Sequence, residues 1–414
     1  MRDWKHEHPV GTLTGDPVPG APELAARGGC VTGVRTLILT EPDQPNAPAG
    51  LKDGAYPRYD RVLKAEAWYP ALPGSDQDRA VYTDHLGRAD LGNLEPFSIP
   101  GRAFRDAEPD PSAGPFPVVV ISHGYPGSRF LLVNLAENLS SKGYVVISVG
   151  HTDNTYEDFP ASGSLESALI HRSRDQRFLI SMLPRLNREG FLKDMLLPEK
   201  TGLIGFSMGG YGALRTIGGR LGGKTQENFR TCAAELEEEE GFRGLKTVKA
   251  AALFAPATFF LDEERSGDID IPTLWFCGTA DYTVGYSRVR SFCERAVRSD
   301  RILVSYLNCG HNIANNPAPP EAYSRTWEIF KRWSDPVWDT RRLNDANCHF
   351  LTAFLDLHLK GDAPKADYLR SPAPAGAETG TGLPGRPAEK PAEWKGFTEG
   401  TSAGIRLEAF PAEK

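Results

Sequence analysis

Hydrophobic and polar positions follow two different patterns along this chain, and the change falls at residue 116. Before it, two strand-like runs, 34–40 and 62–69, lie among many Pro, Gly and Asp residues, while residues 71–115 are rich in turn formers and show little periodicity. The two runs are predicted to be antiparallel strands at the entry to a sheet. Residues 1–115 are therefore expected to form an N-terminal extension that joins a sheet built mainly later in the chain.

From Phe116 onward, continuous apolar runs of strand length alternate with longer segments of helical periodicity. A fully apolar run is typical of a strand buried on both faces. Repeated strand–helix alternation predicts an α/β fold with a mainly parallel central sheet and helices on both faces. The predicted strands are 116–122, 144–149, 202–206, 248–254, 273–277 and 302–307, and the predicted helices are 130–142, 165–186, 208–220, 286–298, 321–333 and 346–360.

This pattern assigns residues 116–360 to one core, with 361–414 as a C-terminal tail that packs on it. Residues 371–391 contain five Pro and four Gly, which is typical of a linker or of a tail draped on the surface. Inside the core, the acidic segment 222–246 is predicted to be either a solvated helix face or a lid over a pocket. Apolar residues that suggest packing of the extreme C-terminus are Trp394, Phe397, Ile405, Leu407 and Phe410.

Composition narrows the class of protein. The 414 residues carry a formal charge of −7, which argues against a nucleic acid or an anionic membrane as the partner. The longest apolar runs have strand length, so no membrane span is expected, and no secretory signal is visible, so a cytoplasmic location is expected. The six cysteines form no C-x-x-C pair, which excludes a common zinc pattern and does not suggest a disulfide scaffold. Cys277, Cys293 and Cys309 are expected to be small buried residues. The oligomeric state is left open.

The motif Gly205-Phe206-Ser207-Met208-Gly209 fits the pattern G-x-S-x-G between a predicted strand and a predicted helix. So sharp a turn holds its middle residue in a strained conformation and lifts the hydroxyl clear of the sheet, at a helix N-terminus. Its glycines are expected because a Cβ there would clash with the neighbouring chain. Ser207 is thus the candidate nucleophile.

A serine hydroxyl needs a base to take its proton, and histidine is the obvious candidate. In this kind of strand–turn–helix arrangement the chain order is Ser, then Asp or Glu, then His. Of the nine histidines, only His311, His349 and His358 follow Ser207, and the last two lie inside a predicted helix. His311 follows a predicted strand directly, in a loop of the kind where ligand sites gather in open α/β sheets. We therefore expect His311 to be the base.

The acid that orients this histidine should lie at the end of the preceding strand. Asp281 lies in the turn after strand 273–277, where its carboxylate would hold the imidazole in the required tautomer. The alternative is Asp262, which follows the strand ending near Phe254.

Acyl transfer also needs two N–H donors directed at the developing oxyanion. Met208, directly after the nucleophile, is expected to supply one. The loop 122–127 after the first parallel strand should supply the other, from Tyr125 or, as the second choice, Gly124. His123 is expected to shape this loop by hydrogen bonding.

Taken in order, these motifs resemble those of the α/β-hydrolase superfamily, and more narrowly the dienelactone hydrolase and platelet-activating-factor acetylhydrolase group. The resemblance covers roughly residues 31–362 and implies serine ester hydrolysis without cofactor or metal. It implies Ser207 as nucleophile, His311 as base, Asp281 as orienting acid, and Tyr125 and Met208 as oxyanion donors. The motifs behind the narrower resemblance are Ile121-Ser122-His123-Gly124-x-x-Gly127, Val149-Gly150-His151-x-Asp153, the helix over 174–186, and the segment from Phe354 to Asp362.

The sequence thus predicts a serine hydrolase that cleaves a small or short-chain acyl ester or a lactone. Gly124, His151 and Phe206 are expected to contact the substrate, with His151 and Asp153 lining the pocket mouth or bracing its loops. An amide or lactam hydrolase and an acyltransferase would use the same triad, and a non-catalytic binding protein on this fold is a third possibility. A dinucleotide-binding protein is excluded because no G-x-G-x-x-G follows the first parallel strand.

Overall fold

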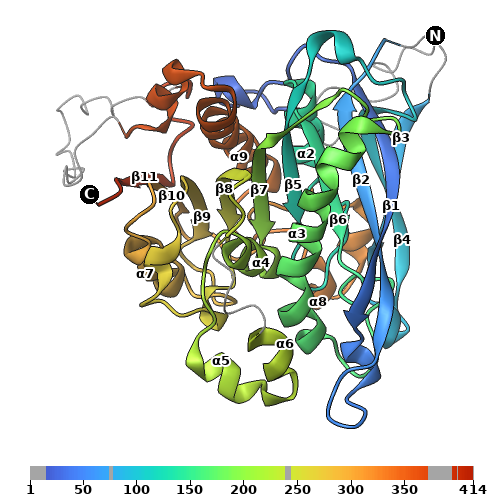
Figure 1. The fold of residues 1–414 in the computed structure, drawn as a ribbon. Coiled ribbons are helices and arrows are strands. Elements are labelled where there is room, and N and C mark those ends of the chain that lie inside the picture. Colours follow the sequence, from blue (N-terminus) through green and yellow to red (C-terminus); the bar gives the residue numbers. More distant parts are fainter. Residues whose placement is uncertain (1–14, 74–77, 238–243, 372–393, 399, 414) are drawn as a thin grey trace, which may run out of the picture.

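The computed structural model describes residues 15–73, 78–237, 244–371, 394–398 and 400–413. Within these ranges, eleven strands form one sheet in the order β11-β10-β9-β8-β7-β5-β6-β2-β1-β4-β3 (Figure 1). The strands are β1 (Thr32–Pro45), β2 (Arg58–Pro70), β3 (Arg79–Leu86), β4 (Glu95–Arg105), β5 (Phe116–Ser122), β6 (Val145–Gly150), β7 (Leu196–Phe206), β8 (Val248–Phe254), β9 (Thr273–Gly278), β10 (Arg301–Tyr306) and β11 (Ile405–Phe410).

The middle of the sheet, from β10 to β6, is entirely parallel. All seven residues of β5 and all six of β6 are buried, as expected for strands covered on both faces. The mainly parallel α/β sheet predicted from strand–helix alternation is therefore confirmed.

Helices cover both faces of this sheet. On one face α3 (Leu165–Arg188) packs against α4 (Met208–Thr216), and on the other α2 (Val133–Ser141) packs against α9 (Thr340–Leu355) (Figure 1). The other α-helices of the described residues are α5 (Gly223–Asn228), α6 (Ala233–Glu237), α7 (Tyr286–Arg295) and α8 (Trp327–Phe330).

The N-terminal region contributes more sheet than its sequence pattern predicts. The antiparallel pair expected around 34–40 and 62–69 is present as β1 and β2, and β2 joins the core through antiparallel pairing with β6. Residues 71–115, expected to be turns, contain the hairpin β3–β4. Every second residue of β4 from Phe97 to Ala103 is buried, but two Pro and one Gly within the strand hide that alternation in the sequence.

Several predicted helices have different bounds in the structure. The helix expected over 321–333 is a 3₁₀ turn, Pro320–Ser324, followed by the short α8. The helix expected over 346–360 begins earlier, where the Asp339 side chain accepts a hydrogen bond from the Arg341 N–H, and ends in one π-helical turn, Asp356–Lys360. Helix α4 ends at Thr216 because two glycines follow shortly after.

The C-terminus returns to the sheet, where β11 pairs antiparallel with β10. Phe397 and Leu407 are buried, whereas most of the stretch 371–391 lies outside the described residues. All six cysteines are free thiols and five are buried. Among the described helices, none has the length and apolar character needed to cross a membrane. The division into extension, core and tail stays a prediction.

Candidate active site

Ser207 lies at the turn between β7 and α4 with φ 55° and ψ −115°, a strained left-handed conformation for a residue other than glycine. Its N–H donates to the Phe254 carbonyl on the neighbouring strand over 2.9 Å, which holds the turn. A Cβ on Gly205 would come within 2.4 Å of the Gly209 carbonyl oxygen, and one on Gly209 within 2.0 Å of the Ser122 carbonyl oxygen. Only glycine therefore allows a turn this tight.

The structure brings Ser207, His311 and Asp281 together in one hydrogen-bonded chain. His311 Nε2 lies 3.0 Å from Ser207 Oγ, and His311 Nδ1 lies 2.8 Å from Asp281 Oδ2. The other carboxylate oxygen, Oδ1, accepts from the backbone N–H groups of Thr283 (2.8 Å) and Val284 (3.2 Å). Asp281 is thus fixed by its own turn while it holds the imidazole, an arrangement able to draw a proton from the serine hydroxyl.

These three side chains come from loops that follow β7, β9 and β10, at the carboxyl edge of the parallel sheet, where sites gather in such folds. Asp262, the alternative acid, instead caps its own loop by accepting from the N–H groups of Glu264 and Arg265. The two histidines that were set aside lie in or beyond α9, where burial lowers the pKa of His349 to about 3.

Sequence reasoning missed Asp335, which holds the loop that carries His311. Its Oδ2 accepts from the Gly310 N–H over 2.7 Å, and its Oδ1 accepts from the N–H groups of Val337 and Trp338. No local motif links a carboxylate to a loop 25 residues earlier, so only the fold reveals this brace.

The two expected oxyanion donors face the same region. Met208 is the first residue of α4, so its N–H has no carbonyl partner within the helix. The loop after β5 lies beside the nucleophile, since a Cβ on Gly124 would be 3.5 Å from Ser207 Cβ. An oxyanion hole from Tyr125 and Met208 fits this placement and stays a prediction.

A cavity of about 510 Å³ opens above Ser207 and His311. Tyr125 and Phe206 line it, together with much of the segment from Asn308 to Pro336. Two of its lining aromatic side chains are strongly exposed, Tyr282 at 96% and Trp327 at 54%. Gly124 and His151, which were expected to contact substrate, are not among the lining residues.

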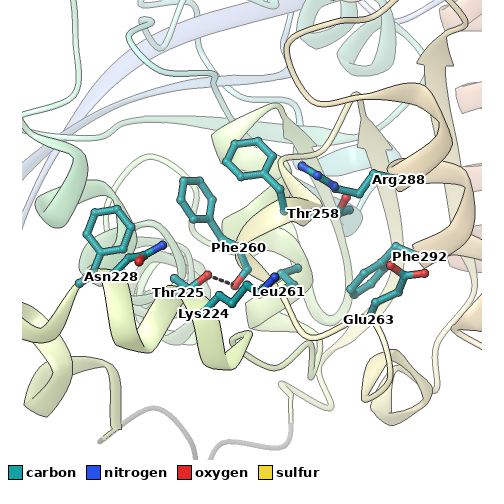
Figure 2. Close-up of a pocket in the computed structure, with 11 residues that line it drawn as sticks. Lys224, Thr225, Asn228, Thr258, Phe260, Leu261, Glu263, Arg288 and Phe292 are labelled. Atoms are coloured by element: carbon teal, nitrogen blue, oxygen red, sulfur yellow. Dashed lines mark hydrogen bonds between the residues drawn. The ribbon is translucent and has the colours of Figure 1, made fainter.

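The described residues of the proposed lid segment, 222–237 and 244–246, do not line this cavity. Of these residues, Lys224, Thr225, Asn228 and Phe229 instead line a separate hollow of about 350 Å³ between α5, α7 and the loop after β8. Figure 2 shows this hollow, where the Thr225 hydroxyl donates to the Phe260 carbonyl over 2.9 Å. Residues 238–243 of the segment lie outside the described part, and a lid role stays a prediction.

His151 belongs to a second Ser–His–Asp chain that lies wholly inside the protein. Its Nε2 lies 2.7 Å from Ser122 Oγ and its Nδ1 2.8 Å from Asp175 Oδ2, and none of the three residues is more than 2% exposed. Asp175 also accepts two hydrogen bonds from Arg61. The Arg61 guanidinium forms a second ion pair, with Asp153. This second hydrogen-bonded chain is closed to solvent and connects the ends of β5 and β6 with α3. Whether His151 and Asp153 brace the loops or line the pocket mouth stays a prediction.

Electrostatics separates the two chains further. Burial and the nearby Arg172 lower the pKa of His151 to about 4, so its ring is neutral at physiological pH. Burial alone would raise the pKa of Asp175, but Arg61 and His151 together outweigh that effect and hold the pKa below its ordinary value. Only the chain ending at Ser207 combines the atom pattern with an open cavity. Among the described residues, no cluster of three or more His, Cys, Asp or Glu side chains is placed to hold a metal ion.

Comparison with known proteins agrees with this architecture. The family model of platelet-activating factor acetylhydrolase, isoform II, matches residues 97–159, a stretch that includes the loop after β5 but not Ser207, Asp281 or His311. A ferulic acid esterase from Streptomyces cinnamoneus is similar in structure, with a TM-score of 0.57 and 21% sequence identity over 82% of this chain and 94% of that chain. No curated protein matches the sequence. The structural likeness shows that the chain has an α/β-hydrolase fold, as predicted.

Proposed function

We propose that this protein is a serine hydrolase that cleaves carboxylic esters. The observation that carries the proposal is the chain Ser207–His311–Asp281, with contacts of 3.0 and 2.8 Å, opening into a cavity at the carboxyl edge of the sheet. The match to an acetylhydrolase family model and the likeness to a ferulic acid esterase support the class of reaction.

In this mechanism Ser207 Oγ attacks the ester carbonyl while His311 Nε2 takes the hydroxyl proton. Asp281 keeps Nδ1 as the protonated nitrogen and stabilises the imidazolium that forms. The N–H groups of Tyr125 and Met208 hold the negative oxygen of the tetrahedral intermediate. When the carbon–oxygen bond breaks, His311 returns the proton to the leaving alcohol. Water then attacks the acyl-enzyme by the same route, which releases the acid and restores Ser207.

The cavity has the size of an ordinary small-molecule site. Its volume of about 510 Å³ lies inside the range of roughly 300–1,000 Å³ that is usual for small-molecule sites. We therefore propose a small or short-chain acyl ester, or a lactone, as the substrate. No step of this mechanism calls for a cofactor or a metal.

The test is the Ser207→Ala variant with p-nitrophenyl butyrate and with a fluorophosphonate probe. We expect kcat to fall by at least about 10⁴-fold, because the remaining groups cannot replace the nucleophile. Peptide mapping should place the probe on Ser207 and none of it on the sealed Ser122. The control is Ser181→Ala, an exposed serine on α3 whose hydroxyl only donates to the Phe178 carbonyl.

Wild-type turnover by Ser207→Ala, with circular dichroism unchanged, would refute the proposal. A panel of matched esters, lactones and amides then separates an esterase from an amide hydrolase, and added alcohols as acyl acceptors separate hydrolysis from acyl transfer.

A further inference from the structure

The peptide group between Gly124 and Tyr125 contains the predicted oxyanion donor. In a trans peptide the carbonyl and the N–H point in opposite directions from the same plane. Whatever holds the Gly124 carbonyl oxygen therefore also decides where the Tyr125 N–H points. That oxygen lies on the side of the loop that faces α3, because it accepts a hydrogen bond from Arg172 of this helix.

Two side chains hold the Gly124 oxygen. His123 Nδ1 lies 2.7 Å from it, and Arg172 Nη2 donates to it over 2.9 Å. The tautomer of His123 follows from a third contact, because the His151 backbone N–H donates to His123 Nε2 over 3.1 Å. Nε2 must then carry a lone pair, which leaves the proton on Nδ1 as a donor to Gly124. Burial also holds the pKa of His123 well below its ordinary value, so this neutral tautomer persists.

Arg172 is fully buried in α3, and the acceptors of its three hydrogen bonds are uncharged. Its Nη1 donates to the His123 carbonyl, and its Nε donates to Asn154 Oδ1 over 3.1 Å. The nearby carboxylate of Asp175 is occupied by Arg61 and His151. Burying a cation whose partners are all neutral oxygens costs desolvation free energy. A functional role for Arg172 would explain why this cost is tolerated.

We propose that Arg172, with His123, is a positioning residue for the oxyanion hole. The pair fixes the Gly124 carbonyl so that the Tyr125 N–H is directed away from the guanidinium and towards the cavity that Tyr125 and Ser207 both line. The guanidinium charge behind the peptide also polarises it and adds a favourable potential for a negative oxygen in front. This inference rests on the proposed function, because it assigns a role in the same reaction.

The variants Arg172→Lys and Arg172→Met test this role. The lysine keeps the charge but can reach fewer of the acceptors, while methionine keeps the apolar stem and removes every donor. Removing one oxyanion donor from a serine hydrolase lowers kcat by about 10²–10³-fold, so misdirecting one should approach that limit. We expect a fall of about 10–100-fold for methionine and about 3–10-fold for lysine. KM for p-nitrophenyl butyrate should change by less than about threefold, because the ester ground state makes little use of the hole.

The inhibition constant of a boronic acid is a measurement that would stay unchanged if Arg172 had only a structural role. Ser207 Oγ adds to boron, its proton passes to His311, and the tetrahedral adduct places one oxygen in the hole. Its inhibition constant should rise by the same factor as kcat falls, while inhibition by the free product acid stays within about twofold. Fluorophosphonate labelling at completion counts the folded sites, so kcat is expressed per labelled Ser207.

An unchanged kcat per labelled site, with unchanged boronate affinity, would overturn the inference even if Arg172→Met lowered the melting temperature. If the methionine variant does not fold, the same comparison is made with the lysine variant: its kcat should fall by the same factor as its boronate inhibition constant rises. A wild-type protein that neither hydrolyses esters nor labels at Ser207 would instead refute the proposed function.

Discussion

Replacing Asp281 by asparagine is the sharpest test of how the three side chains act together. In the structure Asp281 Oδ1 accepts from the N–H groups of Thr283 and Val284, while Oδ2 faces His311 Nδ1. Asparagine can accept those two backbone N–H groups only with its carbonyl oxygen. Its NH₂ group must then face His311, which forces Nδ1 to accept and moves the ring proton to Nε2.

With its proton on Nε2, His311 cannot accept one from Ser207, although every atom stays near its place. The acid-to-amide change in a Ser–His–Asp site lowers kcat by about 10⁴-fold, and we expect about 10³–10⁴-fold here. That corresponds to about 4–5.5 kcal/mol of lost transition-state stabilisation. KM should stay within about threefold, since Asp281 does not touch the substrate.

The assay is p-nitrophenyl butyrate hydrolysis at pH 7.5, with protein counted by completed fluorophosphonate labelling. The matched control is Asp262→Asn, which keeps the oxygen that caps Glu264 and Arg265 and lies outside the hydrogen-bonded chain of Ser207. It should retain wild-type activity within about twofold. The reasoning fails if Asp281→Asn keeps more than a tenth of the wild-type kcat, or if Asp262→Asn loses activity instead.

Three further variants test the cavity, the turn and the buried chain. Tyr282→Ala removes a fully solvated aromatic from the cavity mouth, and steady-state kinetics should show KM for aryl esters raised about 2–10-fold with kcat unchanged; a lower kcat would contradict this. Gly209→Ala forces a Cβ to within 2.0 Å of a backbone oxygen and should lower the urea-unfolding free energy by about 3 kcal/mol or more, whereas Gly223→Ala meets nothing within 4 Å and should be neutral or stabilising. In the unfolded protein His151 is protonated below about pH 6.5, whereas in the folded protein its pKa is about 4. Between these pH values the unfolded state binds more protons, so the free energy of unfolding should rise with pH. His151→Asn should lower that slope near pH 5 by about one proton, or about 1.4 kcal/mol per pH unit, and an equal slope in both proteins would contradict the assignment.

Where sequence reasoning succeeded, the signal was local. The runs that became β5 and β6 are apolar at every position because both faces are covered, and such runs can be recognised without knowing the partners. The signal for the turn at Ser207 is equally local. Its glycines are needed because a Cβ at these positions would clash with backbone atoms a few residues away or on the adjacent strand. The hairpin β3–β4 was missed because proline and glycine interrupt its alternation of apolar and polar residues. Backbone pairing between the two strands stabilises them although their sequence has a low strand propensity.

The sequence by itself determined the α/β class, the strand–turn–helix around Ser207, and the chain order that singles out Asp281 and His311. Only the tertiary structure decided which polar clusters are open to solvent. Ser122, His151 and Asp175 repeat the same hydrogen-bond pattern but are sealed, whereas Ser207 opens into a cavity. Burial depends on packing between segments far apart in the chain, which no motif contains. For the same reason Arg172, 48 residues beyond the glycine whose carbonyl it holds, could be recognised only once α3 was packed against the loop.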